Sequence, residues 1–170
     1  YSKFDALIPL FIPFVWIYLS LYLFVLIPVI DTLNYDIFIN ILFSSLLLLC
    51  INIPVFYLYP SSYPRPELTD LKTISDELLN WLYHIDPPNN TFPSMHVSTT
   101  FTFALNYMLY KKKIRWFVLI WALLIALSTM LIKQHYIIDV IAGIGLATFS
   151  TLFVKKMRKI FDKRKHLKNA

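Results

Sequence analysis

Residues 133–139 read KQHYIID, a short polar stretch with strongly apolar sequence on both sides. His135 and Asp139 are four residues apart, so on a helix their side chains lie on one face, one turn apart. Ionisable groups at a membrane segment are costly to keep there and commonly mark a functional site. The stretch therefore predicts either such a site or a structural hydrogen bond between His135 and Asp139.

The composition of the chain is that of a membrane protein. Hydrophobic residues make up 58% of the 170 residues and charged residues 15%, and the mean hydropathy is +0.60. A soluble domain has roughly 45–50% apolar and about 25% charged residues. The net charge of +6 comes mainly from two basic clusters, residues 111–115 and 155–168, which flank apolar segments. Such clusters fit contact with lipid headgroups and control of topology better than nucleic-acid binding, so no nucleic-acid partner is expected.

The apolar segments predict an all-α fold, a polytopic bundle of transmembrane helices. A helix needs about 20 apolar residues to cross the hydrocarbon core of a bilayer. Five candidate spans are present, and a sixth is expected if one precedes Tyr1. The five predicted spans are residues 6–30, 37–59, 94–110, 116–132 and 136–154.

Prolines and glycines indicate where these helices bend or touch. Pro9, Pro13 and Pro28 are expected to kink the first span or to mark its ends. Gly143 and Gly145 in the last span are expected to allow close contact with a neighbouring helix.

Residues 60–92 are the longest polar segment and are expected to form an outer loop. Thr69 or Asp70 is expected to cap a short helix within this loop. His84 and Asp86 could line a substrate entrance, but they are interpreted as ordinary loop residues. Apolar side chains at helical spacing predict that the helix lies in the plane of the membrane interface: Leu71, Ile74, Leu78, Leu79 and Leu82.

The basic residues predict the orientation of the spans. Basic loops favour the cytoplasmic side, so both basic clusters, including the tail of residues 155–170, are expected in the cytoplasm. Counting spans from there puts Arg65, residues 94–96 and residues 133–135 on the opposite, extracytoplasmic face. The whole chain, residues 1–170, is expected to form a single integral-membrane domain. It is expected to lie in a plasma membrane or an inner membrane.

Three of the polar residues on that face have the chemistry of a phosphate site. Arg65 and Lys133 are cations, and Ser94 offers a hydroxyl next to the N–H groups of a predicted helix N-terminus. Cations and helix N-termini both bind phosphate oxygens. A site at headgroup level predicts that the phosphate belongs to a lipid.

Two histidines and one carboxylate complete the site. His135 is the candidate nucleophile, because Asp139 can hold the tautomer that leaves one ring nitrogen free to attack. His96 is then the candidate acid that protonates the leaving oxygen and the base that later activates water or another acceptor.

These residues resemble the motifs of the type-2 phosphatidic acid phosphatase superfamily, which are KxxxxxxRP, PSGH and SRxxxxxHxxxD. The matching positions are Arg65-Pro66, Pro93 to His96, and Ser128 with His135 and Asp139. The resemblance implies a membrane enzyme that acts through a phosphohistidine and needs neither metal nor other cofactor. It also implies a lipid phosphate as substrate and membrane lipids as partners. By this likeness His135, Asp139 and His96 are catalytic, and Arg65 and Ser94 bind the phosphate.

Three positions depart from that pattern: Leu58, Met95 and Thr129 stand where the family has Lys, Gly and Arg. Two phosphate-binding cations are thereby missing, and Lys133 is expected to replace one of them. The departures are similar to the branch of inositol phosphorylceramide synthase and sphingomyelin synthase-like proteins, which includes phosphotransferases. The acceptor stays open, because water would give a phosphatase and a lipid or sugar hydroxyl a transferase.

Three other interpretations of the same residues remain. His96, His135 and Asp139 could be ligands of a metal ion. A His–Asp pair could also relay protons in a transporter. Finally, the departures at Leu58 and Thr129 would fit a family member that has lost its activity.

Overall fold

The computed structural model describes residues 2–27, 35–110 and 113–168. It is 74% helical, and the described residues contain no β-strand, so the prediction of an all-α fold is confirmed. The elements are α1 (Lys3–Leu7), the 3₁₀ turn η1 (Ile12–Phe14), α2 (Val15–Leu19), α3 (Leu21–Phe24), α5 (Tyr35–Leu58), α6 (Ile74–Ile85), α7 (Met95–Leu109), α8 (Arg115–Leu131) and α9 (Ile137–Lys168).

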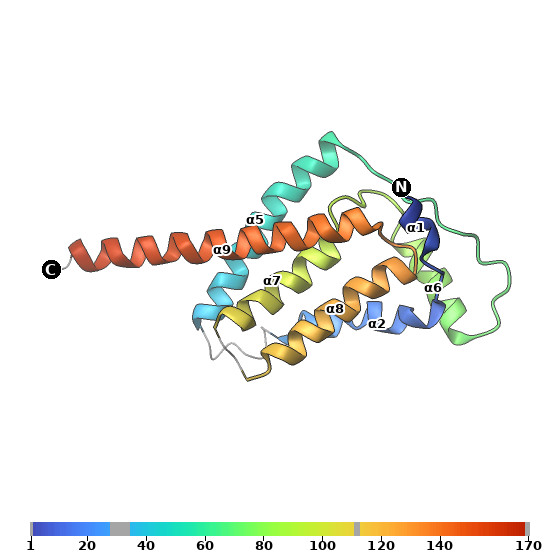
Figure 1. The fold of residues 1–170 in the computed structure, drawn as a ribbon, viewed down its shortest axis with the longest axis horizontal. Helices are drawn as coiled ribbons and strands as arrows, with labels where there is room; N and C mark the ends of the chain where they lie inside the picture. The colour runs from blue at the N-terminus through green and yellow to red at the C-terminus, as the bar shows by residue number, and fades with distance from the viewer. Residues whose placement is uncertain (1, 28–34, 111–112, 169–170) are drawn as a thin grey trace.

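Helix α7 is the centre of the bundle and packs against α5, α8 and α9 (Figure 1). Most of its side chains are buried, including polar ones such as Thr102 and Asn106. A buried polar group must find a hydrogen-bond partner within the protein. Asn106 does so twice, because its Nδ2 donates to the Thr102 carbonyl and its Oδ1 accepts a hydrogen bond from Asn40 of α5.

The predicted first span, residues 6–30, is not one continuous helix. Residues 8–11 are not helical, and the chain forms the short elements α1, η1, α2 and α3 instead. Pro9 and Pro13 explain the break, because proline lacks a backbone N–H and its ring clashes with the preceding turn. The longest apolar helical run left there, Ile12–Phe24, is too short to count as a membrane span by itself.

Within the described ranges, two helices are long and apolar enough to cross a membrane, α5 and the part of α9 that runs from Ile137 to Arg164. They correspond to the predicted spans 37–59 and 136–154. Helices α7 and α8 match the predicted spans 94–110 and 116–132 in position. At about 1.5 Å per residue, however, both are shorter than the roughly 30 Å thickness of the hydrocarbon core.

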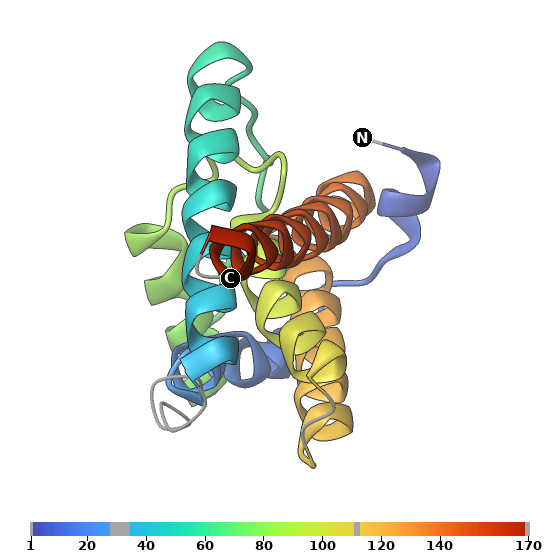
Figure 2. The same cartoon turned by 90° about the vertical axis from the view of Figure 1, so that its left-hand side faces the viewer.

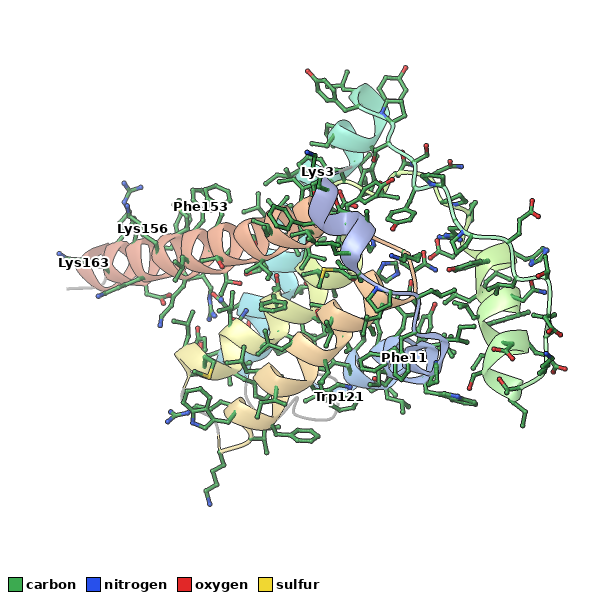
Figure 3. The ribbon with its side chains drawn as sticks, turned by 45° about the vertical axis from the view of Figure 1, so that its right-hand side comes forward. Lys3, Phe11, Trp121, Phe153, Lys156 and Lys163 are labelled. Carbon is green, nitrogen blue, oxygen red and sulfur yellow. The ribbon has the colours of Figure 1, made fainter. Side chains whose placement is uncertain are left out.

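Helix α9 continues through most of the predicted basic tail. Its first half packs against α5 and α7, and its second half extends beyond the other helices (Figure 1). Figure 2 looks toward the C-terminal end of α9, with α5 on one side and α7 and α8 on the other. Side chains of Phe153, Lys156 and Lys163 line the extended half (Figure 3).

The helix predicted in the outer loop is present as α6, but it begins later than expected. Its cap is Thr73 rather than Thr69 or Asp70. The Thr73 hydroxyl accepts a hydrogen bond from the Asp76 N–H, and the Asp76 carboxylate accepts one from the Thr73 N–H. This reciprocal capping box satisfies two backbone donors at once, which explains the starting point.

Some predicted features fall outside the described residues. They are Pro28 and the end of the first span, part of the connection at 111–115, and the last two residues of the tail.

Candidate active site

Three segments meet at one end of the bundle. They are the start of α7, the end of α8 and the start of α9 (Figure 1). Arg65 reaches the same end from the loop after α5, where it bonds to Gln134. Lys156 and Lys163 lie toward the opposite end (Figure 3). The polar residues expected on one face are therefore gathered together, away from the basic half of α9.

The two histidines face each other directly. The His96 Nδ1 atom lies 3.3 Å from the His135 Nε2 atom, although the residues are 39 positions apart. Their ring centroids are separated by 5.6 Å and the ring planes are tilted by 58°. His135 is 7% exposed and His96 is half-buried, so both imidazoles are shielded from bulk solvent while His96 remains accessible.

His135 is paired with Asp139 as expected, but the pair does not lie within a helix. His135 precedes α9, and Asp139 is in the first turn of that helix. The His135 Nδ1 and Asp139 Oδ2 atoms are 3.5 Å apart, longer than an ordinary N–H···O hydrogen bond. Catalytic hydrogen bonds in unliganded enzymes are often long and shorten when substrate binds. The same carboxylate oxygen accepts a hydrogen bond of 2.9 Å from the Tyr136 N–H.

The connection between α8 and α9 fixes where the His135 imidazole lies. The Thr129 carbonyl accepts hydrogen bonds from the N–H groups of both Gln134 and His135, at 2.8 and 3.2 Å. Lys133 takes a positive φ of 56°, which turns the chain back sharply after α8. Thr129 thus contributes through its backbone at the position where the family motif has an Arg side chain.

Asp5 from α1 caps the other side of this turn. Its buried carboxylate accepts a 2.9 Å hydrogen bond from the Ile137 N–H, the first residue of α9. Burial by itself would raise the pKa of Asp5, but hydrogen bonds from Ile137 and Ser2 outweigh it and the pKa lies below its ordinary value. A charged carboxylate at a helix N-terminus is stabilised by the helix dipole.

Ser94 lies at the start of α7 and is completely buried. Its hydroxyl accepts a 3.3 Å hydrogen bond from the Val97 N–H, the bonding of an N-cap residue. The Ser94 N–H donates to the Asp139 carbonyl at 3.1 Å, which links the first turns of α7 and α9. Ser94 therefore has a structural role in this geometry, whereas Met95 and His96 line the adjacent cavity.

A cavity of about 190 Å³ opens beside the histidine pair. This is several times the roughly 30 Å³ that one water molecule occupies in the liquid, so a phosphate group can enter. Its polar and ionisable lining residues are Arg65, Asp86, Asn89, Asn90, Thr91, His96, Gln134 and His135.

Arg65 is held in place by protein acceptors and still has capacity for a ligand. Its Nη1 atom donates to the carbonyls of Tyr83 and Asp86, and its Nη2 atom donates to the Gln134 side chain. A guanidinium has five N–H donors, and Nε has no partner among the described residues. Burial lowers the pKa of Arg65 from its ordinary value, with the Asp86 charge opposing that effect, and a group this basic remains a cation.

Lys133 does not line this cavity. Its Nζ atom donates to the Ile8 carbonyl, in the non-helical segment between α1 and η1. The Lys133 side chain lines a second cavity of about 530 Å³ together with Asp5 and Tyr136, and Arg65 borders both cavities. Gln134, the next residue, is the one whose side chain contacts Arg65.

Sequence reasoning missed several polar residues in or next to the cavity. Asp86, interpreted as an ordinary loop residue, lines the cavity, whereas its neighbour His84 is exposed. Gln134 could have been noticed because it directly precedes His135. Tyr18 lies in an aromatic-rich segment without any motif, yet its hydroxyl is 2.9 Å from the His96 Nε2 atom.

His96, His135 and Asp139 were also considered as metal ligands. Among the residues that the structure describes, no group of three or more His, Cys, Asp or Glu side chains is arranged to hold a metal ion. Each imidazole nitrogen of His96 and His135 instead faces a nitrogen or oxygen atom of another side chain.

A model of the PAP2 superfamily matches residues 37–162. The chain belongs to the PAP2 superfamily. The matched region runs from α5 into the second half of α9 and includes Arg65, His96, His135 and Asp139. Neither the curated proteins nor the solved structures gave a match.

Membership of the PAP2 superfamily indicates a phosphatase or a phosphotransferase. Together with the two apolar helices, it also indicates that this PAP2 protein is a membrane protein. The family resemblance noted from Arg65, His96, His135 and Asp139 is thus confirmed at the level of the superfamily.

Proposed function

We propose that this PAP2 protein cleaves a lipid phosphate ester through a phosphohistidine formed on His135. The observation that carries the proposal is the 3.3 Å approach of His96 Nδ1 to His135 Nε2, beside a cavity lined by Arg65. A nucleophile and an acid must both reach the same phosphorus atom and its leaving oxygen. The phosphoryl group of the substrate takes the place of the direct contact between the two imidazoles.

The reaction has two steps. In the first, the His135 Nε2 lone pair forms a bond to phosphorus, the bond from phosphorus to the leaving oxygen breaks, and His96 gives that oxygen a proton. In the second, His96 takes a proton from water, whose oxygen forms a bond to phosphorus while the bond to His135 breaks. Inorganic phosphate leaves and both histidines are restored. Asp139 stabilises the positive charge that develops on His135.

A hydroxyl of a second lipid or of a sugar can replace water in the second step. The enzyme is then a phosphotransferase similar to the inositol phosphorylceramide synthase branch. The departures at Leu58, Met95 and Thr129 support this second candidate.

We further propose five spans, with the site on the extracytoplasmic face of a plasma or inner membrane and the C-terminal tail in the cytoplasm. The positive-inside rule supports this orientation, because Lys113 precedes α8, Arg115 is its first residue, and Lys155 to Lys168 lie at the end of α9. A phosphatase reporter fused after Ala170 is expected to be inactive. A reporter that fluoresces only in the cytoplasm is expected to fluoresce when it is fused at the same position. The opposite pattern contradicts the orientation.

Phosphate release by the purified protein in detergent tests the function. A panel of lipid phosphates is supplied in excess chelator, together with labelled lipid and sugar alcohols as acceptors. We expect wild-type protein to release phosphate or to label an acceptor, and His135→Ala protein to do neither. Release of phosphate identifies a phosphatase, and labelling of an acceptor identifies a transferase. Equal activity of the two proteins contradicts the proposal.

Arg65→Lys is expected to lower kcat/KM by about 10- to 100-fold, the loss for one or two hydrogen bonds to a charged group. Lysine keeps the positive charge but cannot bond to Tyr83, Asp86 and Gln134 and still present a donor to phosphate. Steady-state kinetics on one lipid phosphate measures the loss.

Lys133→Gln is the matched control, because Lys133 bonds to the Ile8 carbonyl outside the cavity. Its kcat/KM is expected to stay within about threefold of wild type. A larger loss for Lys133→Gln than for Arg65→Lys would mean that Lys133 is the main phosphate ligand.

A further inference from the structure

We propose that Tyr18 and Asp86 are positioning residues that orient His96 and stabilise its protonated form, so that it can deliver a proton to the leaving oxygen. This inference rests on the proposed function and goes beyond it, since Tyr18 precedes the residues that match the PAP2 superfamily. In this arrangement each of the two histidines is paired with a carboxylate. Asp139 serves His135 directly, and Asp86 serves His96 through the Tyr18 hydroxyl.

The contacts form a continuous chain. The Tyr18 hydroxyl donates a hydrogen bond of 3.2 Å to the Asp86 Oδ2 atom and lies 2.9 Å from the His96 Nε2 atom. The Tyr18 and His96 rings are also in contact, with centroids 5.1 Å apart and planes tilted by 53°. On the other side of the His96 ring, Nδ1 faces His135.

Counting protons assigns the direction of each bond. A hydroxyl has a single proton, and an ionised carboxylate can only accept, so the Tyr18 proton points to Asp86. The Tyr18 oxygen then accepts, and His96 must present an N–H at Nε2. His135 must keep its Nε2 lone pair free for attack, so the proton between the two imidazoles belongs to His96 Nδ1. With Asp86 ionised and the His135 Nε2 atom free to attack, this assignment makes His96 an imidazolium at the start of the reaction, with Nδ1–H directed toward the reacting phosphate.

The proton that moves is the one on Nδ1. When the bond from phosphorus to the leaving oxygen breaks, this proton goes to that oxygen and His96 becomes neutral. The proton on Nε2 stays in its bond to Tyr18 throughout. Water returns a proton to Nδ1 in the second step. The Tyr18–Asp86 pair thus holds the ring in one tautomer and offsets its positive charge, as a carboxylate does for a histidine in other hydrolases.

The surroundings hold Tyr18 firmly. Tyr18 is 1% exposed and packs with Val15, Leu79 and Leu82 in a small apolar cluster between α2 and α6. A 3.0 Å hydrogen bond from Trp16 Nε1 to the Ser75 hydroxyl joins the same two helices. Asp86 directly follows α6, and its backbone carbonyl accepts from Arg65. Helix α6 therefore positions the carboxylate and α2 positions the hydroxyl.

A pair of substrates that differ in their leaving group tests the relay. Benzyl phosphate releases an alkoxide, which needs a proton, whereas 4-nitrophenyl phosphate releases a stable phenolate. Tyr18→Phe is expected to lower kcat for benzyl phosphate by at least about tenfold, part of the 10²–10⁴-fold that general acid catalysis commonly supplies. For 4-nitrophenyl phosphate the expected loss in the first step, followed as the burst of nitrophenolate, is less than about threefold.

Matched variants make the test decisive. Tyr22→Phe removes an exposed hydroxyl from the neighbouring helix α3 and is expected to change neither rate. Asp86→Asn is expected to show the same dependence on the leaving group as Tyr18→Phe, and it stands in for that variant if Tyr18→Phe does not fold. Equal losses on both substrates, or no loss in either variant, overturn the relay. If wild-type protein and His135→Ala protein are equally inactive, the proposed function itself has failed.

Discussion

His96→Ala protein incubated with 4-nitrophenyl [³²P]phosphate and quenched in alkali is expected to carry label on His135. The nitrophenolate leaves without a proton, so the His135 Nε2 atom can still attack in this variant. The second step lacks its base, because the His96 Nδ1 atom 3.3 Å from His135 Nε2 is gone. Turnover is expected to fall by about 10²- to 10⁴-fold while the phosphoenzyme accumulates.

The labelled residue can be identified by mass spectrometry of alkaline digests. The double variant His96→Ala with His135→Ala is expected to carry no label. His84→Ala, which removes an exposed histidine of α6, is expected to behave as wild type. Label on any residue other than His135, or label that persists in the double variant, contradicts the assignment of the nucleophile.

Gly143→Ala is expected to lower both thermal stability and activity. A Cβ atom on Gly143 would lie 2.9 Å from the Ser94 carbonyl oxygen and 3.2 Å from the Val97 Cβ atom. Helix α9 would have to move away from the first turn of α7, and overpacking of this kind commonly costs about 1–3 kcal/mol. The first turn of α7 also carries His96, and Asp139 lies about one turn before Gly143 in α9. A shift of about 1 Å at reacting groups can cost about 10²-fold in rate.

Gly145→Ala is the matched control, two residues along the same helix. A Cβ atom on Gly145 meets nothing within 4 Å, so the substitution brings only the helix propensity of alanine, about 1 kcal/mol in favour of the folded state. Unfolding in detergent and phosphate release are measured for both proteins. Equal behaviour of the two variants would mean that the contact of α9 with α7 does not control the site.

The apolar segments and the motif residues allowed much of this structure to be predicted. Helices α5, α7 and α8 begin and end within two residues of the predicted spans, because hydrophobic length alone defines them. The meeting of Arg65, His96 and His135 followed from counting spans and from the basic clusters. Of the predicted pair of close-contact glycines, Gly143 is confirmed, whereas Gly145 faces open space.

Other features depend on geometry that no local pattern contains. The positive φ of Lys133 turns its side chain toward Ile8 and leaves Gln134 beside Arg65. Tyr18 has the same sequence context as the other aromatic residues near it, and only the packing of α2 against α6 brings it to His96. The prolines of the first span were expected to kink it or to mark its ends, but hydropathy does not show that the segment divides into several short elements.

The cap that Asp5 places on Ile137 joins residues 132 positions apart. The bonds from Tyr18 to His96 and from Arg65 to Gln134 also join residues far apart in the sequence, with separations of 78 and 69 residues. During synthesis, the complete set of these bonds can therefore form only after the start of the last helix, α9, has been made. Asp5, Tyr18 and Arg65, which support the site, are synthesised before His135, so the site can form only once the chain has been made as far as α9.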